Sequence, residues 1–316
     1  MTLTLVNLPT PAPQVPRDGW GRPLVVPESG GRPVPHTRTT TFIDCIEDKS
    51  NIINWKQRTV LVGAAQNPHL LEQARGLDLE NPEDKRTLND LAERVSDAAG
   101  ANTKREKGTH LHLLSEHVDR GEPLPAGTSA ADLDDMAAYM MGTVNLRMER
   151  IETFVVVNEL GTAGTFDRTA WYSGPDPWGL PIEGRFIADL KTGSVAYGTL
   201  KMASQLAVYS RGKVYDFTKF PVDVNDRKQF AAWKKTKFSA EEAAQAYTDL
   251  PPVSQKWGII IHLPAGSSTC TLHWVDLELG WQAASLALQI RKMRSVRDAM
   301  RPFVSQATED GLASAA

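Results

Sequence analysis

The chain has 316 residues, of which 41% are hydrophobic and 23% are charged, and its formal net charge is −3. These values are typical of a globular protein with a sizeable core, built as one large domain or two small ones. No apolar run approaches membrane-spanning length, and the N-terminus lacks the pattern of a secretory leader, so we expect a cytoplasmic protein without a membrane partner. Two cysteines, Cys45 and Cys270, exclude a disulfide framework and any metal site that needs four thiolates.

The composition changes along the chain and predicts three segments. Residues 1–38 hold eight of the twenty prolines and show little periodicity, which predicts a loosely ordered N-terminal arm. Residues 39–303 carry periodic apolar patterns and form the predicted domain. Residues 304–316 are rich in Ala and Ser, which predicts a flexible tail.

The first half of the domain has helical signals. Pro82 marks the start of one helix and Gly100 its end, and Ser129 has the spacing of a capping residue for another. The charged stretch 103–109 is expected to be a linker before a short helix. The predicted helices cover residues 50–66, 82–99, 110–121 and the segment after Ser129.

The second half changes to a period of two or to continuous apolar runs, which predicts strands. Three strands are expected in succession, then a helix, a hairpin and a final helix. The predicted ranges are 152–160, 164–172 and 184–193 for the strands, 195–212 for the helix, 256–278 for the hairpin and 281–300 for the last helix. This order predicts an α/β or α+β fold with a mixed central sheet flanked by helices.

The stretch FIADLKTG carries the first chemical signal. Asp189 and Lys191 lie two residues apart on a strand, so both point to one face. Asp167 lies near the end of the preceding strand and meets them if the two strands are adjacent. Two close carboxylates with oxygen ligands only, including the backbone carbonyl of Leu190, are suited to Mg²⁺ or Mn²⁺. By itself, the Asp–Lys pair is better explained as a surface ion pair on a half-exposed strand.

Two helices add further candidates. Gln205 and Tyr209 are four residues apart and share a helix face, as do His112 and Glu116. Taken singly, His112 is typical of a half-buried helical histidine, Tyr209 of a core residue and Glu116 of a helix surface.

The ordered series GTHLHLLSE, GTFDR, DLKTG and QLAVY, over residues 108–210, resembles the RecB-like and phage-type exonucleases of the PD-(D/E)XK nuclease superfamily. The resemblance implies a restriction-endonuclease-like core. It implies that Asp167 and Asp189 bind the metal with the Leu190 carbonyl, and that Lys191 is the catalytic lysine.

The resemblance also assigns roles outside the Asp–Lys pair. His112 matches the histidine that ligates or approaches the metal. Gln205 and Tyr209 match a Q-x-x-x-Y motif, which lies against the active site and the DNA backbone. An additional acid precedes the first aspartate in some relatives; Glu159 is our choice for it, with Glu152 and Glu116 as competitors.

The chain departs from some relatives. Two distant cysteines cannot hold the iron–sulfur cluster of the CRISPR-associated branch, so no such cluster is expected. No G-x-x-x-x-G-K-[ST] phosphate loop is present, which favours a stand-alone nuclease over a helicase fusion.

Residues 211–237 hold eight Lys or Arg against three Asp, with aromatic residues between them. This composition predicts a nucleic-acid surface that follows phosphates and stacks bases. A solvated basic face whose aromatic rings pack inward fits equally well. The predicted contacts are Lys213, Lys219, Arg227, Lys228, Trp233, Lys234 and Lys235.

We therefore expect a metal-dependent DNA exonuclease of recombination, repair or phage DNA metabolism. Its expected partners are DNA and a single-strand annealing or recombination protein, in the bacterial host's cytoplasm if a phage encodes it. The alternatives are an endonuclease or RNA-directed nuclease with the same site, an inert nucleic-acid-binding protein of the same fold, and a sugar or nucleotide hydrolase. Polarity of digestion and oligomeric state stay open.

Overall fold

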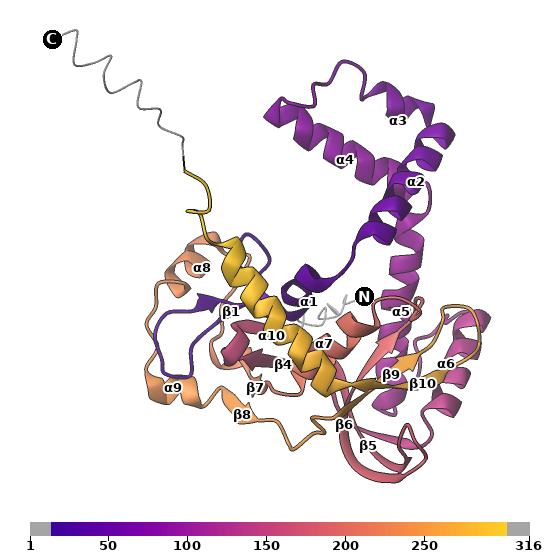
Figure 1. The fold of residues 1–316 in the computed structure, drawn as a ribbon, viewed down its shortest axis with the longest axis vertical. Coiled ribbons are helices and arrows are strands. Elements are labelled where there is room, and N and C mark those ends of the chain that lie inside the picture. The colour runs from indigo at the N-terminus through magenta and orange to yellow at the C-terminus, as the bar shows by residue number, and fades with distance from the viewer. Residues whose placement is uncertain (1–13, 302–316) are drawn as a thin grey trace, which may run out of the picture.

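The computed structural model describes residues 14–301 (Figure 1). Within this range, eight strands form one mixed sheet in the order β10-β9-β6-β5-β4-β7-β8, with β3 paired to β5. The strands are β3 (Thr37–Arg38), β4 (Leu146–Val157), β5 (Thr162–Pro175), β6 (Pro181–Lys191), β7 (Lys213–Tyr215), β8 (Tyr247–Asp249), β9 (Trp257–His262) and β10 (Thr271–Asp276). A separate pair joins β1 (Leu24–Val25) to β2 (Val34–Pro35).

The three strands β4, β5 and β6 form an antiparallel meander at the centre of the sheet. The next strand in space, β9, runs parallel to β6 and reaches it through a long crossover that contains a helix. Parallel pairing requires such a crossover, whereas the meander needs only tight turns. The predicted mixed sheet flanked by helices is confirmed.

Helices cover both faces of the sheet. Helices α5 (Ala101–Asp119) and α6 (Ala130–Gly142) pack on one face, where Leu111 and Tyr139 meet Ala170 and Leu190. Helices α7 (Thr199–Tyr209) and α10 (Leu277–Arg294) pack on the other. Figure 1 shows α10 lying across α7. The smaller helices of the sheet body are α1 (Thr39–Ile43), α8 (Arg227–Trp233) and α9 (Ala240–Ala244).

Helices α2 (Ser50–Gln66), α3 (Pro68–Glu72) and α4 (Pro82–Ala98) project from the sheet body (Figure 1). They share a small apolar cluster of their own around Leu70, Leu91 and Val95. Among residues 14–301, no helix combines the length and the apolar character that crossing a membrane requires.

The helices predicted over residues 50–66, from Pro82 and after Ser129 are confirmed. The linker expected at 103–109 is wrong, because α5 runs unbroken from Ala101 to Asp119. Within that stretch, Gly108 faces Thr192, whose hydroxyl would lie 2.8 Å from a Cβ at this position. The glycine therefore serves close packing of the helix against the end of β6 and does not break it.

The prediction of a loosely ordered arm over residues 1–38 is wrong for residues 14–38. Residues 1–13 lie outside the described part. Leu24, Val25 and Val26 are buried. The Val26 amide donates to the Tyr215 hydroxyl at 3.1 Å, and the Tyr247 hydroxyl donates to the Val26 carbonyl at 2.9 Å. The two tyrosines thus satisfy the backbone of a buried segment that has few ladder hydrogen bonds. The tail predicted at 304–316 also lies outside the described residues.

Packing of α10 on α7 depends on Gly280, because a Cβ there would lie 2.3 Å from the carbonyl oxygen of Ala203. We expect Gly280→Ala to lower the free energy of unfolding by about 1–3 kcal/mol, the usual cost of overpacking. Alanine is otherwise the better helix former by about 1 kcal/mol, so the sign of the change is informative. Urea unfolding measures it, with Gln289→Ala on the exposed side of α10 as the control. A Gly280→Ala protein as stable as the wild type would contradict the close contact.

Candidate active site

Strands β5 and β6 separate where the two candidate aspartates lie. The last residue pair joining them is Arg168 with Ala188, and the next position is Asp167 on β5 and Asp189 on β6. Beyond that pair, the amide of Leu190 donates to Asp167 Oδ2 at 2.9 Å. The carboxylate thus accepts a hydrogen bond that a backbone carbonyl of β5 would accept in a regular sheet. The N–H and C=O of one strand residue point toward the same neighbour, so the Leu190 carbonyl also faces this gap. Asp167 and Asp189 are therefore cross-strand neighbours.

Burial dominates the electrostatics of both aspartates. It raises the pKa of Asp189, which is 3% exposed, and repulsion from Asp167 raises it further, while Lys191 opposes the change. Burial likewise raises the pKa of Asp167, against the lowering effect of Arg168 and of the Leu190 amide. Two carboxylates in one low-dielectric space disfavour double ionisation. Added positive charge therefore stabilises the form in which Asp167 and Asp189 are both ionised.

Asp189 is held by two side chains. The Lys191 ammonium lies 2.5 Å from Asp189 Oδ2, and the Gln205 amide donates to Asp189 Oδ1 at 3.2 Å. Gln205 comes from α7, on the far face of the sheet from α5. The Lys191 side chain keeps 30% of its surface exposed, so it lies at the boundary between the site and solvent.

Tyr209 follows Gln205 by one turn of α7 and is buried. Its ring packs against Phe166, and its hydroxyl contacts Thr39 and Gln205. Burial, with the nearby aspartates, raises the pKa of this phenol, which keeps it neutral. The structure therefore places Tyr209 behind Gln205 as a support, and the expected position against the DNA backbone is wrong for this buried side chain.

Helix α5 brings His112 to Asp167. The imidazole Nδ1 lies 3.4 Å from Asp167 Oδ2. Burial lowers the pKa of His112, with the opposing effect of Asp189 second, so the ring is in its neutral form at pH 7. A neutral imidazole can serve as a metal ligand, whereas an imidazolium cannot. The candidates Asp167, Asp189 and His112 thus meet as the sequence predicted.

The sequence offered Glu152 only as a competing choice for the additional acid. In the structure, Glu152 is the acid opposite Asp167. On β4 it lies between Ile151, which pairs with Arg168, and Thr153, which pairs with Phe166. Its backbone has φ 48°, a left-handed conformation that is costly for a residue with a Cβ, close to a bulge in β4. Burial raises the pKa of its carboxyl to about 7, with Asp167 and Glu116 as further causes.

Glu159, our choice for the additional acid, lies outside this group of residues. Glu159 lies in a short helical turn after the end of β4, and its charge acts on Arg211. From Glu152 to the end of β4 at Val157 the strand extends roughly 16 Å, at about 3.3 Å per residue. The turn at Gly161 could have corrected the choice, because counting outward from it along both strands pairs Glu152 with Asp167.

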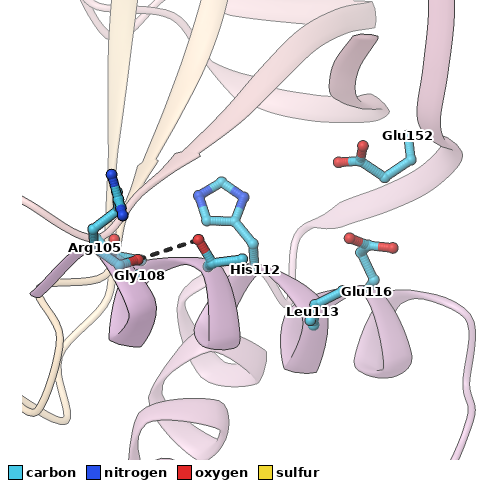
Figure 2. A pocket seen from close by; sticks show the side chains of 8 residues that line it. Arg105, Gly108, His112, Leu113, Glu116 and Glu152 are labelled. Carbon is cyan, nitrogen blue, oxygen red and sulfur yellow. Dashed lines mark hydrogen bonds between the residues drawn. The ribbon is translucent and has the colours of Figure 1, made fainter. Parts of the chain in front are cut away.

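A cavity of about 530 Å³ opens beside these residues (Figure 2). Glu116 and Glu152 lie near one another at one end of the view, next to His112, and Arg105 lies at the other end. The site therefore has an open side with both acidic and basic groups. The lining residues are Arg105, Gly108, Thr109, His112, Leu113, Glu116, Glu152 and Thr192.

The donor set fits a small hard cation. Asp189 Oδ2 is buried and receives no well-directed hydrogen bond from any described residue, although the Lys191 ammonium lies beside it. Asp167, the Leu190 carbonyl and His112 supply further donors. Within residues 14–301, no three His, Cys, Asp or Glu side chains are gathered closely enough to hold a metal alone. Mg²⁺ commonly uses one or two carboxylates and completes its shell with water and substrate phosphate.

The basic segment 211–237 lies at the β8 edge of the sheet, around β7, β8 and α8. Its aromatic rings pack inward: Tyr215, Phe220 and Trp233 are buried in one cluster with Leu24 and Phe154. The predicted role of Trp233 as a base-stacking platform is therefore wrong, because its ring faces the core.

Most of the basic side chains in this segment stay exposed. Lys213 differs from them because it forms an ion pair: its ammonium lies 2.8 Å from a carboxylate oxygen of Glu28. The arrangement of the segment therefore matches the alternative interpretation, a solvated basic face over an apolar cluster. The exposed members are Lys219, Arg227, Lys228, Lys234, Lys235 and Lys237.

Comparison with known proteins adds no relative. The chain matches no protein-family model, and no curated protein resembles it closely enough to count as a match. Inference about the function of this chain therefore depends on the geometry of the site itself.

We expect Asp189→Asn to raise the free energy of unfolding of the metal-free protein at pH 7. The pKa of Asp189 is raised in the folded state, so the folded protein binds this proton more tightly than the unfolded chain does. Stability from this group is therefore present at low pH and is lost as the pH rises above about 4. The gain should be on the order of 1–3 kcal/mol at neutral pH and should disappear near pH 4.

Urea unfolding of both proteins across this pH range measures the effect. Glu183→Gln, an exposed carboxylate at the other end of β6, is the matched control and should change little. An Asp189→Asn protein less stable than the wild type at pH 7 would refute the repulsion between the two aspartates.

Proposed function

We propose that the chain is a metal-dependent deoxyribonuclease with a restriction-endonuclease-like core, acting as an exonuclease on phosphodiester bonds. The observation that supports this best is the meeting of Asp167, Asp189, Lys191 and Gln205 where β5 and β6 separate. These residues belong to the ordered motifs that resemble the PD-(D/E)XK nucleases. DNA is the proposed substrate, a single-strand annealing or recombination protein the proposed partner, and the cytoplasm the proposed location.

Asp167, Asp189 and the Leu190 carbonyl would hold Mg²⁺ or Mn²⁺, with water and substrate phosphate completing the shell, and His112 would approach the metal from beside Asp167. A divalent cation bound there supplies a water of lowered pKa and stabilises charge on the phosphate. Lys191 extends from the same strand and its side chain is partly exposed, so its ammonium can meet the anionic phosphate as charge develops. Gln205 fixes the orientation of the Asp189 carboxylate from behind.

The open cavity gives a substrate access to this edge of the sheet. It lies along α5 beside His112 and Glu116, and Arg105 offers a cation for a DNA phosphate there. Glu152 faces the same space and takes the place of the additional acid. A buried pair of carboxylates destabilises a fold that binds no cation, which argues against an inert nucleic-acid-binding protein. The adjacent lysine and the Gln205 contact argue against a sugar or nucleotide hydrolase.

The wild-type chain is expected to degrade linear DNA in the presence of Mg²⁺ or Mn²⁺. Lys191→Met removes a charge that acts on the reacting phosphate, so kcat should fall by about 10²–10³-fold. Asp189→Ala should abolish cleavage. The assay follows release of nucleotides from linear, circular, single-stranded and double-stranded DNA and from RNA, with Glu183→Gln as the control.

The substrates separate the alternatives. Cleavage of circular DNA supports an endonuclease, and cleavage of RNA alone supports an RNA-directed nuclease. DNA binding without cleavage supports the inert protein. Unchanged cleavage by Asp189→Ala would rule out this site as the catalytic centre.

Glu152 and Glu159 form a matched pair of carboxylates on and just after β4. We expect Glu152→Gln to lower kcat by about 10–100-fold, the usual effect of removing a group that supports a metal ligand. Glu159→Gln should leave kcat unchanged, because Glu159 lies beyond the far end of the strand. Steady-state cleavage of linear DNA gives both values, and the opposite ranking would restore Glu159 as the additional acid.

A further inference from the structure

Arg168 is the largest fully buried side chain in the described chain, at 1% exposure, and it follows Asp167 directly on β5. Its guanidinium donates through Nε to Asp119 Oδ2 and through Nη2 to Ser115 Oγ, both at 2.5 Å. The Tyr139 hydroxyl donates to the other oxygen of Asp119 at 2.8 Å. The guanidinium therefore joins β5 to α5 and α6.

Stability alone gives a weak reason for this arrangement. Removing an arginine and a carboxylate from water carries a large desolvation cost, and apolar replacements of similar volume are often as stable. Arg168 and Asp119 are nevertheless both almost fully buried, at 1% and 3% side-chain exposure. Their position, directly behind a proposed metal ligand, suggests a use other than stability.

Two further contacts connect the network to the active site. Arg168 Nη1 lies 3.7 Å from Asp167 Oδ2. On α5, the Ser115 hydroxyl donates to the carbonyl of His112 at 2.7 Å, so the group that anchors Nη2 also fixes the helical turn of His112. One guanidinium thus reaches the side chain of Asp167 and the backbone that carries His112.

These contacts also select one oxygen of Asp167. The Leu190 amide, His112 Nδ1 and Arg168 Nη1 all approach Oδ2, at 2.9, 3.4 and 3.7 Å. None of the three uses Oδ1. A carboxylate held in this way has a fixed orientation and keeps one oxygen for a cation, which is the usual function of residues that support metal ligands.

We propose that Arg168 is a positioning residue that sets Asp167 and the His112 turn of α5 relative to one another. This inference rests on the proposed metal-dependent function. It assigns Asp119, Ser115 and Tyr139 as the anchors that hold the guanidinium. The alternative is an ion pair that only joins α5 and α6 to the sheet.

Two variants separate these roles. Arg168→Lys keeps the charge but cannot make the separate directed contacts of a guanidinium fork. The double variant Arg168→Met with Asp119→Leu removes both charges together, so neither member of the Arg168–Asp119 pair is left buried without its partner. Arg185→Lys is the matched control, because Arg185 pairs with Glu149 between β6 and β4 and has no contact with Asp167 in the structure.

The first measurement is the binding of Mn²⁺ alone, by isothermal titration calorimetry, with urea unfolding of the same samples. We expect both Arg168 variants to bind Mn²⁺ about 10–100-fold more weakly than the wild type. The double variant should stay folded, and Arg185→Lys should bind as the wild type does. A folded double variant with wild-type Mn²⁺ affinity overturns the proposal.

The second measurement is steady-state cleavage of linear DNA. Both variants should lose about 10–100-fold in kcat, while KM for DNA stays within about twofold, because Arg168 is buried away from DNA. If the double variant unfolds, Tyr139→Phe decides by the same readouts: weaker Mn²⁺ binding supports the positioning role, and unchanged binding and kcat overturn it.

The outcomes for this inference and for the nuclease function are distinct. A wild type that binds Mn²⁺ but cleaves no nucleic acid overturns the nuclease function, and weaker Mn²⁺ binding by the variants still supports the positioning role. Wild-type cleavage retained by both Arg168 variants overturns the positioning role alone. A wild type that binds no Mn²⁺ overturns both.

Discussion

The site depends on one hydrogen bond, from the Leu190 amide to the carboxylate of Asp167. By accepting this bond, Asp167 takes the place of a backbone partner and lets β5 and β6 part while remaining connected. The two strands then present their aspartates side by side, and each is supported from a different face of the sheet. Asp167 is held by groups on the α5 side, and Asp189 by Gln205 on α7. The layered fold therefore brings two independent supports to one small gap.

The parts that were predicted from sequence are those that local rules determine. The alternation of a strand places Asp189 and Lys191 together, and helical spacing places Gln205 beside Tyr209. The capping residue Ser129 and Pro82 mark helix starts, because they act on backbone groups within a few residues. The mixed sheet followed from the order of these elements.

The parts that failed depend on contacts between distant segments. Glu152 needed the register of β4 against β5, and the aromatic rings near Trp233 needed knowledge of which side faces the core. The burial of residues 24–26 depends on hydroxyl groups that lie 189 and 221 residues further along the chain. Arg168 gave no signal at all, since a charged residue on a strand is expected at the surface and its partners lie on two helices.

Helix α5 is shared by two parts of the molecule. Its first half adjoins the projecting helices α2 to α4, and its second half carries His112 and the anchors of Arg168 (Figure 1). Nineteen helical residues form a rod roughly 28 Å long, at about 1.5 Å per residue. This helix, held at one end by a buried guanidinium, connects the projecting helices to the turn that carries His112, beside the gap between β5 and β6.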